Sequence, residues 1–257
     1  MFVIMKLEQI RKANLRILLT KSESIEEYYK VGRSFIIDLL SGIGKLSMKY
    51  RQFQLIDFPY LYGERQLSSV ILPTLSKICD GAVLAELPAK RNCRLQNHEI
   101  ENSSGRIDYW CIYKDYSIAL EVKHSYDAFL SDITRESRVV NRWEYMTIDQ
   151  LQSIKEDVKY FEEPTKGILR IGLHFVISYS DKHPTKDLVK EYENKLPDIL
   201  NRLQNDLCKR KPTITTPDFM ACWLPPTQMV LEGEGTYPGI ILVGKVFKPI
   251  VHKGVSV

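Results

Sequence analysis

Hydrophobic residues follow two different periods along this chain, and each period predicts a different secondary structure. Apolar side chains recur at the spacing of an amphipathic helix over residues 23–50, 64–80, 126–143 and 184–208. A further helix is predicted to begin at Thr147, which can form a capping box with Gln150. Alternation and short apolar runs predict strands over residues 82–88, 106–124, 168–178, 218–224 and 239–247. Residues 91–105 and 225–239 are predicted as loops. Strands interleaved with helices indicate an α/β protein.

The segment of residues 106–124 is predicted to form a β-hairpin. Both halves alternate in the manner of half-buried strands, and the only strongly polar pair between them is Lys114-Asp115. A two-residue turn at that pair places Tyr113 opposite Tyr116 and sets the register of the whole hairpin.

This register brings four charged residues together. Asp108 lies opposite Glu121 and Arg106 lies opposite Lys123, and all four are predicted to share one face because side chains alternate along a strand. Directly opposed carboxylates repel each other and destabilise a sheet unless a cation lies between them. A divalent metal ion would supply that charge. The alternative is that the four residues form a solvated network of salt bridges.

A second Glu-x-Lys in the chain serves as an internal comparison. Glu193-Asn194-Lys195 has the same spacing as Glu121 and Lys123, but it lies in a polar, helix-like stretch with no partner acid on a neighbouring strand. We therefore give it no functional weight.

An acid on one strand, Glu-x-Lys on the next and a helical Glu before them resemble the core of the PD-(D/E)xK nucleases, which have the restriction-endonuclease-like fold. The matching residues are Asp108, Glu121 and Lys123, with Glu64 as the upstream helical acid. Ile107 stands in place of the proline in the family's name. The resemblance implies that Asp108, Glu121, Lys123 and Glu64 are the catalytic residues.

The resemblance also implies an arrangement of the chain. Over residues 60–180 it implies the order helix, strand, strand, strand, helix, strand, with a central mixed sheet flanked by helices. We expect a single domain over residues 1–257. In it, residues 1–58 form an N-terminal helical extension, and residues 181–257 add a helix and a strand pair packed on the core.

Phosphodiester hydrolysis requires a hard cation that polarises the phosphoryl oxygen, stabilises the leaving oxygen and helps to ionise a water molecule. Magnesium prefers oxygen ligands and usually takes only one or two carboxylates, which Asp108 and Glu121 can supply. The resemblance adds the backbone carbonyl of Val122 as a third ligand, and Mn²⁺ can substitute for Mg²⁺. The Lys123 ammonium would stabilise phosphoryl charge or act on the attacking water. Glu64 is either an additional carboxylate of the metal site or a first-turn acid that stabilises the helix dipole.

Arginines on the predicted helix of residues 126–143 are candidates for nucleic-acid binding. Arg135, Arg138 and Arg142 fall within a narrow arc of this helix. Such a stripe could follow a phosphate backbone, although it is also typical of a solvated helix face. Gln150 and Gln152 could reach the site as accessory residues, and an exposed helix face is the alternative for them. The candidate nucleic-acid-binding residues are Arg106, Arg135, Arg138 and Arg142.

Composition narrows the class of protein further. A chain of 257 residues with 44% hydrophobic residues can bury a substantial core, and a net charge of +4 requires any nucleic-acid surface to be local. Five cysteines without a Cys-x-x-Cys pair argue against a disulfide framework or a zinc knuckle and favour the reducing cytoplasm. No segment approaches the ~18 consecutive apolar residues of a membrane span, so we expect no membrane partner. The apolar run at the N-terminus is too short for a signal peptide.

Together these patterns predict a magnesium-dependent nuclease that acts on DNA rather than RNA, as an endonuclease of restriction, repair or phage-defence type. It could act as a homodimer. The alternative is a nucleic-acid-binding module that has the nuclease fold without cleavage activity.

Overall fold

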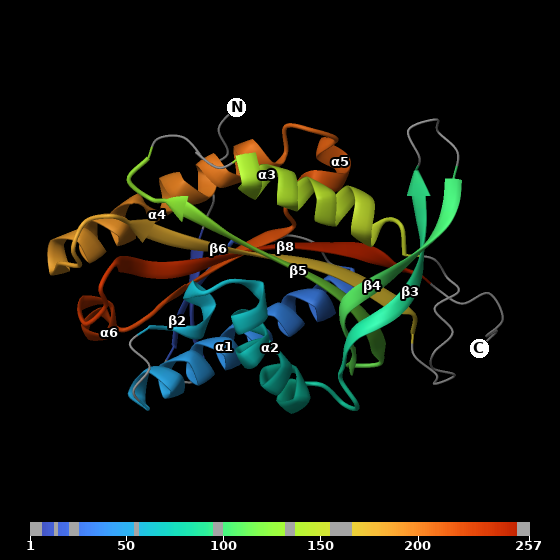
Figure 1. The fold of residues 1–257 in the computed structure, drawn as a ribbon, viewed down its shortest axis with the longest axis horizontal. Helices are drawn as coiled ribbons and strands as arrows, with labels where there is room; N and C mark the ends of the chain where they lie inside the picture. Colours follow the sequence, from blue (N-terminus) through green and yellow to red (C-terminus); the bar gives the residue numbers. More distant parts are fainter. Residues whose placement is uncertain are drawn as a thin grey trace.

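A mixed β-sheet forms the centre of the molecule (Figure 1). The computed structural model describes residues 7–12, 15–20, 26–53, 57–94, 100–131, 137–154 and 166–250. In this part of the chain the sheet has eight strands in the order β1-β2-β7-β8-β6-β5-β4-β3. Strands β5 and β6 are parallel, and the other neighbouring pairs described are antiparallel. The strands are β1 (Leu7–Lys12), β2 (Leu15–Thr20), β3 (Leu84–Arg94), β4 (Ile100–Tyr113), β5 (Tyr116–Ala128), β6 (Ile168–Ser180), β7 (Phe219–Leu224) and β8 (Thr236–Ile250).

Helices cover both faces of the sheet, which confirms the prediction of an α/β protein with a flanked mixed sheet. Helices α1 (Glu27–Gln52) and α2 (Glu64–Ile78) lie on one face, and α3 (Ser137–Glu144) and α4 (Lys186–Leu207) lie on the other (Figure 1). The short helices are the 3₁₀ helix η1 (Pro59–Leu61), the π-helix η2 (Tyr145–Leu151), α5 (Pro212–Thr215) and α6 (Thr227–Leu231).

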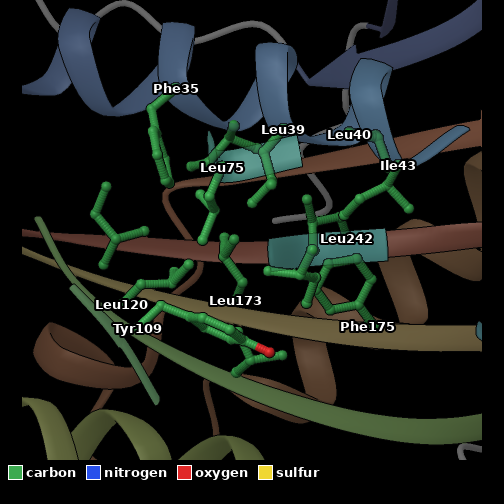
Figure 2. Packing of buried hydrophobic residues seen from close by; sticks show 14 of the residues in the cluster. Phe35, Leu39, Leu40, Ile43, Leu75, Tyr109, Leu120, Leu173, Phe175 and Leu242 are labelled. Atoms are coloured by element: carbon green, nitrogen blue, oxygen red, sulfur yellow. The ribbon is translucent and has the colours of Figure 1, made fainter. Parts of the chain in front are cut away.

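Two hydrophobic clusters, one on each side of the sheet, hold these layers together. Figure 2 shows the first cluster, in which Phe35 and Leu39 of α1 and Leu75 of α2 face Phe175 and Leu242 of the sheet. Each of these side chains is fully buried, so each contributes roughly 1.5–3 kcal/mol of transfer free energy. The second cluster joins α3 and α4 to the opposite face.

Helix α1 approaches β8 closely at Gly32, where a Cβ atom would lie 2.8 Å from Cγ2 of Val246. The glycine on the apolar side of this helix therefore marks a close packing contact between helix and sheet.

Between α2 and β6 the elements follow the predicted order: α2, β3, β4, β5, α3, β6. The predicted helices 64–80 and 184–208 and the strands 168–178 and 218–224 are also confirmed within a few residues. The C-terminal strands β7 and β8 pair with each other, and β8 also pairs with β6, so both belong to the central sheet. Strands β1 and β2, which the prediction of a helical extension did not include, extend the sheet beyond β7.

Four local predictions are wrong. The predicted helix 126–143 begins as strand, because β5 continues to Ala128 in parallel pairing with β6. The predicted loop 91–105 contains the ends of β3 and β4, whose backbones pair from Ala89↔Gly105 to Arg94↔Ile100. The predicted loop 225–239 contains α6 and the start of β8. Thr147 is no N-cap: its hydroxyl donates to the Trp143 carbonyl at 2.8 Å inside a continuous helix.

No helix in the described part of the chain combines the length and the apolar character needed to cross a membrane.

Candidate active site at the open edge of β5

The turn between β4 and β5 sets the register of the candidate site. Lys114 and Asp115 both have positive φ, 46° and 63°, as in the type I′ turns that suit a two-residue hairpin. The observed pairs run from Tyr113↔Tyr116 to Tyr109↔Leu120, which confirms the predicted register. One further step would place Asp108 opposite Glu121.

The ladder between β4 and β5 stops just before that step, and β5 continues with one edge open. Strand β6 pairs with β5 as far as Ala128, whereas the described pairing of β4 ends at Leu120. Backbone N–H and C=O groups along such an edge need other partners. Side chains of the candidate site supply them.

Four side chains bind the backbone of two residues on this edge. The carboxylate of Asp108 accepts from the Val122 N–H at 2.7 Å, and the Lys123 ammonium donates to the Val122 carbonyl at 3.1 Å. One step further, Glu64 Oε1 accepts from the His124 N–H at 3.3 Å, and Arg142 donates to the His124 carbonyl. Residues from β4, β5, α2 and α3 thus meet along one strand edge.

Asp108 and Lys123 form the centre of this group. Their charged atoms, Oδ2 and Nζ, lie 3.9 Å apart, and their side chains are 27% and 13% exposed. Glu121 is fully buried. The Val122 carbonyl, which the resemblance assigns to a metal, accepts a hydrogen bond from Lys123 in this structure.

The strands are irregular at Asp108, and the assumption of strict alternation is wrong there. Tyr109 packs in the cluster under α1 and α2, yet Ile107, two residues away, packs in the cluster on the other face. In β3, Ala85 and Leu87 pair with Tyr109 and Ile107, but the ladder skips Glu86, which has a φ of 57°. A positive φ is uncommon at residues other than glycine, and the exceptions tend to cluster at functional sites.

Glu86 is a residue that the sequence analysis missed. It lies within 3.5 Å of Arg106, so Arg106 extends toward β3, and both side chains are largely exposed. Its signal in the sequence is an acid in the otherwise apolar predicted strand 82–88.

Electrostatics couple the acids to each other. Burial raises the pKa of the Asp108 carboxyl above its ordinary value, and the carboxylates of Glu64 and Glu86 raise it further. Lys123 and the Val122 N–H oppose that rise. The carboxylates of Glu64 and Glu86 therefore act electrostatically on Asp108.

Glu64 and two of the predicted arginines line one cleft of about 440 Å³. Arg138 and Arg142 are one helical turn apart on α3, and Arg142 Nη1 lies 3.4 Å from Glu64 Oε1. Arg135 lies outside the described residues. The cleft is lined by Tyr62, Gly63, Glu64, Arg65, Gln66, His124, Ser125, Tyr126, Arg138 and Arg142.

Gly63 shapes the entry to this cleft. It is the N-cap of α2, and its φ of 115° lies in a region that favours glycine. The turn directs the chain from η1 into α2 and leaves Tyr62 and Glu64 on either side of it. Glu64 is the first residue of the helix, so both of its predicted roles, helix-dipole partner and site carboxylate, remain compatible with its position.

Three further polar residues, His174, Gln150 and Gln152, lie in three different environments. His174 is fully buried, as expected of a core residue, with Nε2 2.9 Å from the Ser125 hydroxyl, and burial lowers its pKa to about 3. Gln150 lies within the π-helix η2. Gln152 is exposed and lines a different cleft, beside Lys245.

Comparison with known proteins gives no match to a protein-family model, to a curated protein or to a solved structure. Among the described residues, no group of three or more His, Cys, Asp or Glu side chains is arranged to hold a metal ion.

Proposed function

We propose that this chain is a metal-dependent nuclease with a restriction-endonuclease-like core that hydrolyses phosphodiester bonds of DNA. One observation carries the proposal: an acid and a lysine from adjacent strands, Asp108 and Lys123, lie 3.9 Å apart at an open strand edge, with Glu121 on the same hairpin. The order of elements from α2 to β6 supports the same proposal.

The donor set fits magnesium, which takes few carboxylates and keeps several waters. Asp108 and Glu121 would hold the ion, with the Val122 carbonyl as a third oxygen donor if Lys123 turns away from it. When bound, the ion supplies charge neutralisation at the phosphoryl oxygen and an ionised water. Glu121 is fully buried, and a bound cation would offset the cost of burying its charge.

The protein's own groups do the remaining work in this proposal. Lys123 donates to oxygen atoms that gain charge in the transition state. The ion pair with Asp108 holds the Lys123 ammonium beside the Asp108 carboxylate, so both groups would face the same phosphate. Arg138 and Arg142 bind phosphates, and an exposed Arg106 extends that surface along β4.

The test is cleavage of plasmid and linear DNA with Mg²⁺ or Mn²⁺, with EDTA as the metal-free condition. Asp108→Asn and Glu121→Gln are expected to abolish cleavage and Mn²⁺ binding together. Glu193→Gln is the matched control, because Glu193 belongs to the other Glu-x-Lys, within α4. Cleavage by Asp108→Asn at the parental rate would refute the proposal. DNA binding without metal-dependent cleavage by the parent would support the inactive binding module instead.

A further inference from the structure

The cleft between α2 and α3 has the chemistry of a nucleotide site. Its volume of about 440 Å³ lies within the ~300–1,000 Å³ that small-ligand sites usually occupy. One part of its lining is aromatic and another part is cationic, as a base and a phosphate would require.

Tyr62 and the half-buried Tyr126 form the aromatic part, and Tyr62 is the more exposed of the two. The Tyr62 side chain is 55% exposed although it is large and hydrophobic, and it lines the cleft. Its hydroxyl donates to Asp57 Oδ2 at 3.3 Å, which restricts the orientation of the ring. An exposed aromatic ring held in one orientation is a platform on which a base can stack.

Arginines form the cationic part. Arg138 is exposed, and Arg142 is 44% exposed while its guanidinium binds Glu64 and the His124 carbonyl. A guanidinium carries five donors, so a phosphate can be added to its existing partners.

We propose that this cleft binds one unpaired nucleotide of a DNA strand, with its base stacked on Tyr62 and its phosphate held by Arg138 and Arg142. Bases in an intact duplex are stacked on each other, so only an unpaired base can stack on a protein ring. The substrate class is therefore DNA with a single-stranded overhang, flap or gap rather than a continuous duplex.

The location supports the assignment. Glu64 lines the cleft and accepts from the His124 N–H, two residues along β5 from the Val122 N–H that Asp108 binds, so the cleft adjoins the candidate catalytic group. Lys123 precedes His124, which lines the cleft, on the same strand edge. A nucleotide in the cleft would place an adjacent phosphodiester beside Asp108 and Lys123. The identity of the ligand as DNA rests on the proposed nuclease function.

The test measures binding in EDTA by fluorescence anisotropy, using the Asp108→Asn protein, a blunt duplex and the same duplex with an overhang. We expect tighter binding of the overhang, and Tyr62→Ala should weaken that binding by roughly 5- to 150-fold. Tyr62→Phe should retain it, because the ring remains. Tyr145→Ala is the matched control, since Tyr145 is equally exposed at 55% but does not line the cleft. Arg138→Ala should lower the salt slope by about 0.7 on single strands.

Three outcomes would overturn the inference. The first is equal affinity of the parent for the blunt and overhang duplexes. The second is equal loss of binding in Tyr62→Ala and Tyr62→Phe, which would assign Tyr62 a structural role through Asp57. The third is saturable binding of free dAMP by calorimetry without any preference for overhangs, which would indicate a site for free nucleotides. Binding is measured without metal, so the two proposals can fail separately. Mg²⁺-dependent cleavage without a preference for overhangs refutes this inference alone. A preference for overhangs without Mg²⁺-dependent cleavage refutes the proposed nuclease activity.

Discussion

Replacing Lys123 with Gln tests the link between structure and proposed mechanism most directly. The substitution removes a charge that lies 3.9 Å from Asp108 Oδ2 and leaves a side chain of similar length. At an effective dielectric constant of ~20, the Coulomb energy of two unit charges at this distance is about 4 kcal/mol, which is an upper limit because part of each side chain faces water.

Lys123 opposes the rise in the pKa of Asp108, so its removal must raise that pKa further. Each 1.36 kcal/mol of lost pair energy corresponds to one pH unit, so even a third of the upper limit moves the titration upward by about one unit. Metal binding requires the ionised carboxylate. The acid limb of Mn²⁺ binding should therefore shift to higher pH in Lys123→Gln, while binding well above that limb should be unchanged or tighter.

The assay is Mn²⁺ titration by electron paramagnetic resonance across a pH series, combined with cleavage rates at saturating metal. Turnover is expected to fall on the order of 10²-fold or more, the scale for loss of a charge stabiliser or proton-transfer group. Lys195→Gln is the matched control, since Lys195 pairs with Glu191 on the surface of α4. An unchanged acid limb together with parental turnover would refute the reasoning.

Two further outcomes concern stability. Asp108→Asn should raise the melting temperature in neutral buffer, because a carboxylate whose pKa is raised by folding costs stability while it is ionised. This gain in melting temperature should vanish as the pH falls through the raised pKa. A gain that persists in acid would contradict this account. Arg202→Ala should lower the free energy of unfolding in urea by roughly 3–5 kcal/mol, because it leaves the Asp127 carboxylate, 1% exposed, without its closest cation. The surface variant Lys195→Ala should cost less than ~1 kcal/mol in the same measurement, and equal costs for the two variants would show that burial of Asp127 is unimportant.

Local patterns predicted the long helices and the hairpin register well because the information is contained in the segments themselves. The two-residue turn at Lys114-Asp115 follows from where the polar pair interrupts the alternation, and the turn then dictates every pair up to Tyr109↔Leu120. Patterns failed where pairing with a distant strand decided the outcome. Residues 126–128 show helical spacing, but hydrogen bonds to β6 make them part of β5.

The candidate site divides in the same way. The sequence identified Asp108, Lys123 and Glu64 by residue type and spacing, and the structure brings all three to one strand edge. The sequence could not reveal that the pairing of β4 with β5 ends at Leu120, or that Glu86 adopts a positive φ beside Asp108. Both depend on how three strands twist relative to one another, which no single segment encodes.

The sequence by itself determined the type of most elements, the turn of the hairpin and the side-chain types of the candidate site, because periodicity, turn preference and side-chain chemistry are local properties. Only the tertiary structure decided which backbone groups of β5 remain open, that Arg142 and Glu64 meet from helices on opposite faces of the sheet, and that Tyr62 lines a cleft with them. These features arise where distant segments meet, and their free energies come from burial and pairing across the fold.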